Sequence, residues 1–340
     1  MKRLSFVSIV ASTFLLSCAV LAADSDTRSE RKPYILKAAT NNAQISGQYQ
    51  GMSILKRLVE ERTSGRVTVE IFSDSVLGDE EQIAEKMQSG NVDFTIHTSA
   101  KGANFVPELD IYSPPYTFKN WAHMKAVINS VVNDRLARAV MERRGDYLTG
   151  VYTDGLRNVF TKTVINKLDE LKGLKIRTMT GPSEVSTWRS LGVNPTPTAY
   201  LDLRYALKTG EVDGAENTMT SILGMKFYEN SKYVLRTGHN YMAMLGIMSG
   251  RFIKKLPKDL ANIVLQAASD SAKEQLDWAI DFDLKNELIL KEKYGVKVTE
   301  LSKEDYAKAI SICQKVKIDN AKRIHMEKEQ RLIDSMANKF

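Results

Sequence analysis

Two arginines and an asparagine stand at predicted strand ends, where their side chains could hold a small anion. Arg177 lies near the end of the strand expected over 174–179, Asn217 follows a strand expected over 212–215, and Arg157 follows a strand-like segment. Ligands of open α/β sheets bind beyond the carboxyl ends of the strands. A guanidinium offers paired planar donors that match a carboxylate. The pattern predicts a carboxylate cleft, although a structural ion pair at Arg177 or a turn-stabilising role for Asn217 fits equally.

The chemistry of common enzymes is missing from the sequence. It has no GxSxG elbow, no Walker loop and no GxGxxG fingerprint. None of the histidines pairs with another at a spacing of three or four residues; they are His97, His123, His239 and His325. We therefore expect a binding protein rather than an enzyme, with no metal and no cofactor.

Composition also bounds the partners. The 340 residues carry a formal net charge of +7, with 43% hydrophobic and 26% charged residues, as in a soluble globular protein of two domains. No block of Lys and Arg is interleaved with aromatic residues, so nucleic acid is not an expected partner. After a leader is removed only Cys313 remains, which excludes an internal disulfide. We expect a monomer.

The first 23 residues read as a secretory signal peptide. Lys2 and Arg3 precede an apolar run over residues 4–20, and Leu21-Ala22-Ala23 offers a small-residue cleavage site. The predicted location is the periplasm. Two other interpretations stay open: an uncleaved membrane anchor, and a lipoprotein attached through Cys18.

Strands and helices alternate in two similar blocks. The first block is expected to hold strands at 34–39, 67–71 and 92–96 with helices at 48–64 and from Asp79 to Gly90. The second is expected to hold strands at 174–179 and 212–215 with helices at 183–191 and 200–209. Both contain Gly-x-Val-Asp, at Gly90 and at Gly210. This β-α-β order predicts parallel sheets in two α/β lobes.

The remaining segments connect and extend these blocks. A single helix is expected over 121–144, a strand over 147–152, and mostly helix after residue 256. No low-complexity linker separates the lobes, so discontinuous lobes are predicted. The first is expected to contain 33–154 and about 243–282, and the second 155–242 and about 283–340.

Two segments resemble the solute-binding proteins of tripartite ATP-independent periplasmic (TRAP) transporters. They are Leu168-Asp-Glu-Leu-Lys-Gly-Leu-Lys-Ile-Arg177 and Ala206-Leu-Lys-Thr-Gly-Glu-Val-Asp-Gly-Ala-Glu-Asn217. Shorter matches at 77–80, 114–118, 226–229 and 237–241 extend the likeness over roughly residues 34–300. The resemblance implies a two-lobed periplasmic binding protein fold (class II-like) with a hinge and long lobe-spanning C-terminal helices. It also implies a carboxylate ligand and delivery to a membrane permease driven by an ion gradient.

Site residues follow from the same resemblance, position by position. Arg177 matches the arginine that pairs with the ligand carboxylate, Asn217 matches a ligand-bonding asparagine, and Arg157 matches a second arginine of many members. Glu80 matches a position that can bond ligand hydroxyls. Tyr200 and His239 join the candidate list, although spacing alone fits core packing for Tyr200 and an ordinary loop hydrogen bond for His239.

One departure concerns the far half of the pocket. Many members that bind sugar acids carry a His-Pro pair before the first helix, where this sequence has Ser46-Gly47, with Asn41 as a nearby polar substitute. A fixed carboxylate at Glu80 would repel a second ligand carboxylate but accept hydrogen bonds from hydroxyls. The sequence therefore favours a sugar acid over a four-carbon dicarboxylate. An ABC-type binding protein, a secreted enzyme acting on a small carboxylate and a sensory module are the competing hypotheses.

Overall fold

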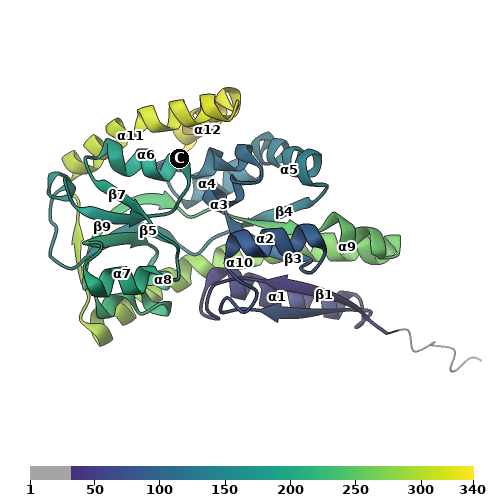
Figure 1. The fold of residues 1–340 in the computed structure, drawn as a ribbon. Coiled ribbons are helices and arrows are strands. Elements are labelled where there is room, and N and C mark those ends of the chain that lie inside the picture. Colours follow the sequence, from purple (N-terminus) through teal and green to yellow (C-terminus); the bar gives the residue numbers. More distant parts are fainter. Residues whose placement is uncertain (1–31) are drawn as a thin grey trace, which may run out of the picture. The chain divides into compact units, whose positions relative to one another are not determined.

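The predicted parallel arrangement is present in the first sheet. The computed structural model describes residues 32–340, so the predicted signal peptide and Cys18 lie outside the described residues. Residues 34–340 form one compact unit (Figure 1). In the first sheet the strands follow the spatial order β2 (Val67–Phe72), β1 (Tyr34–Ala39), β3 (Phe94–Thr98), β10 (Met244–Met248) and β4 (Tyr147–Tyr152). β1 is parallel to β2 and β3, whereas β10 is antiparallel to both β3 and β4.

Helices cover both faces of this sheet and complete the first lobe. They are α1 (Gly47–Arg62), α2 (Glu80–Ser89), α3 (Ser99–Gly102), α4 (Trp121–Ile128), α5 (Val131–Arg144) and α9 (Gly250–Lys255), with the 3₁₀ turn η1 (Pro107–Tyr112). Met52 and Leu55 of α1 pack in one core cluster with β2, and Met124 and Leu136 of α4 and α5 pack in the other. Cover on both faces explains why β3 and β10, in the middle of the sheet, are buried at every position.

The helix expected over 121–144 is two helices, because Ser130 starts a new one. Its side chain accepts a hydrogen bond from the amide of Val132 at 3.2 Å, which caps α5. Asn129 donates from Nδ2 to the carbonyl of Lys125 at 2.7 Å and closes α4. The apolar periodicity continues across this break, so the pattern alone suggested one helix.

The second lobe is built on a mixed sheet. Its spatial order is β11 (Lys297–Glu300), β9 (Tyr233–Tyr241), β5 (Leu156–Thr161), β8 (Gly214–Asn217), β6 (Lys175–Thr178) and β7 (Asn194–Pro197). β6 is parallel to β7 and β8, and β5 is antiparallel to β8 and β9. The helical segments of this lobe are α6 (Pro182–Ser190), α7 (Leu203–Thr209), α8 (Met219–Gly224), α11 (Lys303–Arg323), η2 (Leu168–Leu171) and η3 (Phe227–Glu229).

The repeated Gly-x-Val-Asp segments have matching geometry. Gly90 and Gly210 both end a helix in the left-handed conformation, each with φ of 83°. Asp93 accepts a hydrogen bond from the backbone amide of Lys37 at 3.0 Å, and Asp213 accepts one from the amide of Lys175 at 2.8 Å. In both lobes the aspartate thus ties the segment after a helix end to the backbone of a neighbouring strand.

The chain passes between the lobes where β4 ends and β5 begins. Gly155 lies in this crossing with φ of 119°, and a Cβ there would lie 2.2 Å from Cγ of Asp283. A side chain would therefore be excluded twice, by backbone strain and by space. Helix α10 (Lys258–Tyr294) packs against α1 and β4 of the first lobe and against α8 of the second, as Figure 1 also shows. The two-lobed α/β fold and the long C-terminal helix are confirmed.

The end of the chain departs from the expected lobe boundary. Helix α12 (Glu327–Met336), which precedes the turn η4 (Ala337–Lys339), packs against α4 and α5 of the first lobe. Ala321, Ile324 and Ile333 belong to the first-lobe core. Helix α12 thus packs its apolar side against α4 and α5, whereas the expected boundary placed 283–340 with the second lobe. Within residues 32–340, every helix is too short or too polar to cross a membrane.

Candidate ligand-binding site

A cavity of about 270 Å³ lies between elements of the two lobes. The first lobe contributes residues from the loop after β1, the start of α1, the start of α2 and the end of β3. The second contributes residues from the ends of β6 and β8, the loop before α7 and the start of β5. Strand carboxyl ends thus meet at the cavity, as the strand pattern predicts. Six of the seven predicted site residues line it: Asn41, Glu80, Arg157, Arg177, Tyr200 and Asn217.

Arg177 is a buried cation without a carboxylate partner in the described chain. The side chain lies at the end of β6 and is 2% exposed. Its Nε donates to the carbonyl of Thr198 at 2.9 Å, and its guanidinium lies 5.9 Å from the ring centre of Tyr200. No ion pair joins it to any residue of 32–340. In this structure Arg177 is therefore not part of a structural ion pair.

Burial makes the charge of Arg177 costly. Loss of solvation lowers its pKa to about 10, and the neighbouring Arg157 contributes in the same direction while Glu216 opposes it. The side chain still carries its proton at neutral pH. A buried charge without a counter-ion is unfavourable, and an anion bound next to Arg177 would supply that counter-ion.

Arg157 has a partner that the sequence patterns did not reveal. Nε and Nη2 donate to the two carboxylate oxygens of Glu216 at 2.6 and 2.7 Å, and Nη2 also donates to the carbonyl of Glu216 at 3.0 Å. Nη1 lies 3.2 Å from Sδ of Met242. A thioether is a weak acceptor, so this N–H group can turn to a ligand oxygen.

His239 lies behind Glu216 and is not among the cavity-lining residues. Its Nε2 lies 3.2 Å from Oε2 of Glu216, and its Nδ1 lies 2.8 Å from the hydroxyl of Thr237. A carboxylate only accepts, which assigns the proton to Nε2 and lets Thr237 donate to Nδ1. His239 therefore holds Glu216 in place rather than facing the ligand space.

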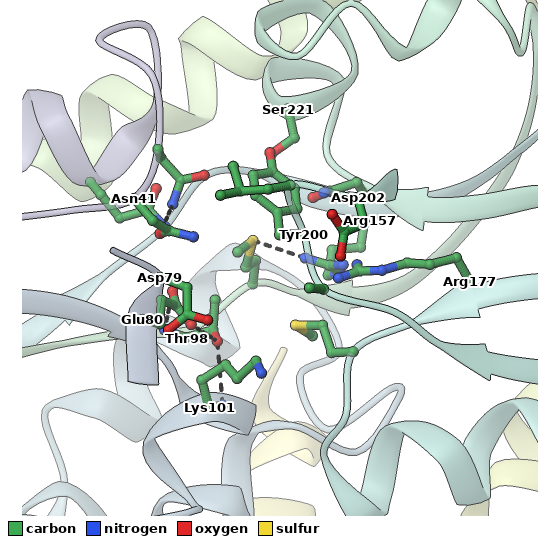
Figure 2. Close-up of a pocket in the computed structure, with 17 residues that line it drawn as sticks. Asn41, Asp79, Glu80, Thr98, Lys101, Arg157, Arg177, Tyr200, Asp202 and Ser221 are labelled. Carbon is green, nitrogen blue, oxygen red and sulfur yellow. Dashed lines mark hydrogen bonds between the residues drawn. The ribbon is translucent and has the colours of Figure 1, made fainter. Parts of the chain in front are cut away.

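The opposite end of the cavity is rich in acceptors. Glu80 opens α2 and accepts hydrogen bonds from the hydroxyl of Thr98 at 3.1 Å and from its amide at 3.4 Å. Burial raises the pKa of Glu80 to about 7, against the lowering effect of Thr98 and Lys101. Figure 2 shows Asn41, Glu80 and Thr98 on one side of the cavity and Arg157 and Arg177 on the other.

Asn217 and Asn41 present amide groups to the ligand space. Oδ1 of Asn217 accepts from the amide of Thr218 at 2.9 Å, which leaves its NH₂ group available as a donor. Oδ1 of Asn41 accepts from Nδ2 of Asn42 at 2.9 Å. Asn217 thus stabilises a turn, as the alternative reading expected, and lines the cavity as well.

Sequence reasoning missed other lining residues. Lys101 donates from Nζ to Glu81 at 2.8 Å and to the hydroxyl of Thr180 in the second lobe at 2.9 Å. Met179 and Met242 add apolar surface. Spacing carries no signal for these side chains, since each reaches the cavity only through the packing of one lobe against the other.

Tyr200 lines the cavity because α7 begins later than expected. The helix predicted over 200–209 starts at Leu203, and Tyr200 lies in the preceding turn. Its ring packs edge-on against Phe227 at 5.9 Å and under Arg177. Core packing and ligand contact are therefore both available to this ring. In residues 32–340, no group of three or more His, Cys, Asp or Glu side chains is arranged to hold a metal ion.

Comparison with known proteins identifies the family. Residues 38–322 match the family described as bacterial extracellular solute-binding protein, family 7 (DctP). The chain belongs to this family. The DctP proteins are the periplasmic solute-binding proteins of TRAP transporters, so the predicted resemblance is confirmed and the chain is a binding protein rather than an enzyme.

Individual DctP relatives are similar over most of their length. A solute-binding protein of Verminephrobacter eiseniae is 30% identical over 272 residues, which cover 80% of this chain and 81% of the relative. A TRAP solute-binding protein of a Sulfitobacter species, solved with bound α-D-taluronate, has a TM-score of 0.84 at 25% identity, covering 88% of this chain and 97% of its own. The sugar acid binding protein of Advenella mimigardefordensis, solved with galactonate, has a TM-score of 0.84 at 26% identity. The match covers 91% of this chain and 99% of the Advenella protein.

Proposed function

We propose that this chain captures a singly charged sugar acid, such as a uronate or an aldonate, in the periplasm. It would deliver the acid to the membrane subunits of a TRAP permease driven by an ion gradient. The observation that carries the proposal is the buried, unpaired guanidinium of Arg177 at one end of the cavity. A carboxylate is the anion whose geometry matches that planar pair of donors.

The rest of the cavity supports a hydroxylated ligand. Glu80 and Asn41 line the end remote from Arg177, and Asn217 offers free amide donors. Acceptors such as the Glu80 carboxylate favour ligand hydroxyls and disfavour a second ligand carboxylate. Two similar structures, with bound taluronate and galactonate, agree with such a ligand.

Affinity must come from the whole enclosure rather than from one arginine. A hydrogen bond to a charged group contributes about 1.5–3 kcal/mol, while micromolar binding needs about 8 kcal/mol. Burial of the ligand between the two lobes would supply much of the difference. Binding would then shift the equilibrium toward the closed form that the permease recognises.

A thermal-shift screen followed by calorimetry tests the proposal. The panel contains aldonates, uronates and four-carbon dicarboxylates, with neutral galactose as the matched control that lacks a carboxylate. We expect at least one sugar acid to raise the melting temperature, since a ligand at a hundredfold excess over its Kd stabilises by about 2.7 kcal/mol. Galactose should have no effect. Binding of succinate but of no sugar acid would replace the proposal with the dicarboxylate alternative.

One further measurement addresses the sensory hypothesis. Uptake of the labelled acid in cells that carry the cognate permease, and its loss when the gene for this chain is deleted, would separate transport from a purely sensory role. A monomer is expected in size-exclusion chromatography with light scattering.

A further inference from the structure

Glu216 cancels the charge of one of the two arginines at the anion-binding end. The carboxylate receives Nε and Nη2 of Arg157 at 2.6 and 2.7 Å, a bidentate pair in which the side chains are 0% and 2% exposed. Salt in the solvent screens such a buried pair very little. Arg157 therefore adds hydrogen-bond donors to the cavity wall without adding net positive charge.

The surrounding side chains keep Glu216 in place and ionised. His239 donates to its Oε2 at 3.2 Å and is itself oriented by Thr237 at 2.8 Å. Burial disfavours the ionised form of Glu216, but Arg157 and His239 outweigh it and lower the pKa of Glu216 below its usual value. The carboxylate therefore stays ionised at neutral pH.

The remaining cations of the cavity wall leave one charge uncompensated. Lys101 is paired with Glu81 at 2.8 Å. Among the described residues, Arg177 has no such carboxylate partner and donates only to the carbonyl of Thr198. Of the cations in the cavity wall, Arg157 and Lys101 are thus paired with carboxylates and Arg177 is not; the wall also contains the acidic residues Asp79, Glu80 and Asp202.

We infer that Glu216 sets the charge of the ligand. By cancelling Arg157, it matches the cavity to an acid with one negative charge and disfavours an acid of the same length with two. The inference rests on the proposed function and names Glu216 as the residue that makes the site prefer a single negative charge. Arg157 then serves as a hydrogen-bond donor to a ligand hydroxyl or carbonyl oxygen, in the place where it now faces the sulfur of Met242.

The closeness of Glu216 to the cavity wall makes this effect measurable. Glu216 does not itself line the cavity of about 270 Å³, but it contacts Arg157, which does, at 2.6 Å. Adding a unit of positive charge to the wall favours a second ligand charge by a factor on the order of tenfold to a hundredfold in affinity at an effective dielectric constant of about 20.

Galactonate and galactarate are suitable probes, because they share one hydroxylated six-carbon chain and differ in a second carboxylate. By calorimetry at pH 7.5, the wild-type protein should bind galactonate at least about tenfold more tightly than galactarate. Glu216→Gln keeps the shape of the side chain and removes its charge. In this variant the affinity ratio should move at least about tenfold toward galactarate.

Glu184→Gln is the matched control. Glu184 is buried, and burial together with the charge of Glu216 raises its pKa well above the usual value. With a pKa of about 8, Glu184 is mostly protonated at pH 7.5, so its replacement removes only a minor fraction of a charge and the galactonate-to-galactarate ratio should stay within about threefold of the wild type. An equal shift in this control would overturn the inference, because any buried glutamine would then have the same effect.

The outcomes separate the inference from the function on which it rests. Tight binding of galactarate by the wild-type protein overturns the inference without any variant, and so does an unchanged ratio in folded Glu216→Gln. If Glu216→Gln does not fold, the double replacement Arg157→Gln with Glu216→Gln removes both charges together. It should retain the preference for galactonate, and a preference for galactarate there would contradict the inference. Failure of the wild-type protein to bind any acid of the panel would instead overturn the proposed function, and this inference with it.

Discussion

Oδ1 of Asp154 accepts a hydrogen bond of 2.6 Å from the backbone amide of Gly47, the first residue of α1. The same carboxylate accepts from the hydroxyls of Thr218 and Ser221, both at 2.9 Å, at the start of α8 in the second lobe. One buried side chain at the lobe crossing thus binds the beginnings of two helices from different lobes. Ser221 also lines the cavity, which links this junction to the ligand site.

Asp154→Ala should therefore destabilise the protein. It leaves a buried amide and two buried hydroxyls without their acceptor, so the free energy of unfolding should fall by about 3 kcal/mol in urea titrations. The control is Asp277→Ala, which removes an exposed aspartate paired with Lys125 and should change stability by less than about 1 kcal/mol. If both replacements lowered the free energy of unfolding by the same amount, Asp154 would not stabilise the junction between the lobes.

Arg177→Ala should remove most of the affinity for the acid that binds best in the panel. Loss of a buried charge pair with the ligand costs more than about 2 kcal/mol, so Kd should rise at least about 30-fold in calorimetry. Arg204→Ala is the control, because Arg204 is an exposed arginine paired with Glu229. A Kd for Arg177→Ala within threefold of the wild-type value would argue against Arg177 as the anion clamp.

Glu80 should make stability depend on pH in the ligand-free protein. Burial raises its pKa to about 7 from the usual 4.5 of a glutamate, so between these two pH values the folded state holds a proton that the unfolded state releases. The resulting stabilisation is complete below pH 4.5 and is lost as the pH rises through 7, by about 3 kcal/mol. Glu80→Gln should abolish this loss.

The measurement for Glu80 is a set of denaturant titrations between pH 4.5 and 8. The stability difference between Glu80→Gln and the wild type should grow in favour of the variant as the pH rises. Glu85→Gln, at an exposed position of the same helix, controls for the helical tolerance of glutamine. A difference between Glu80→Gln and the wild type that does not change with pH would contradict the raised pKa.

Lys101 and Thr180 should stabilise the closed lobes in the complex. Nζ of Lys101 in the first lobe donates to the hydroxyl of Thr180 in the second at 2.9 Å. A double-mutant cycle with Lys101→Met and Thr180→Val should give a coupling of about 0.5–1 kcal/mol. It should appear mainly as faster ligand release in stopped-flow fluorescence. If the effects of the two replacements simply add, Lys101 and Thr180 do not interact in the closed form.

Local signals in the sequence were enough for many elements of the fold. Asp79 and Gly90 bound α2 as predicted, because the aspartate forms a capping box with Gln82 and the glycine adopts a left-handed conformation. The strand-end positions of Arg177 and Asn217 were also predictable. Position along a strand depends on neighbouring residues, which the sequence displays directly.

Pairings over long separations were not predictable in the same way. Arg157 and Glu216 are 59 residues apart, and nothing in the spacing announces that they meet. The sequence analysis assigned about 243–282 to the first lobe, but the position of β10 between β3 and β4 in the sheet was not predicted. Each depends on how complete lobes pack. Patterns of hydrophobicity record that a residue is buried, but not which residue buries it.

Polar side chains of α10 form hydrogen bonds to the segment that crosses between the lobes. The helix is therefore coupled to any movement of one lobe relative to the other. Gln275 donates from Nε2 to the carbonyl of Thr153 at 2.7 Å, and Asp283 accepts from the amide of Leu156 at 3.1 Å. These two hydrogen bonds, about 12 Å apart along a helix, hold both ends of the segment between β4 and β5. A rotation of either lobe therefore applies torque to α10. The bending stiffness of α10 therefore contributes to the free energy of closing the two lobes, although this part of the helix lies away from the ligand-binding cavity.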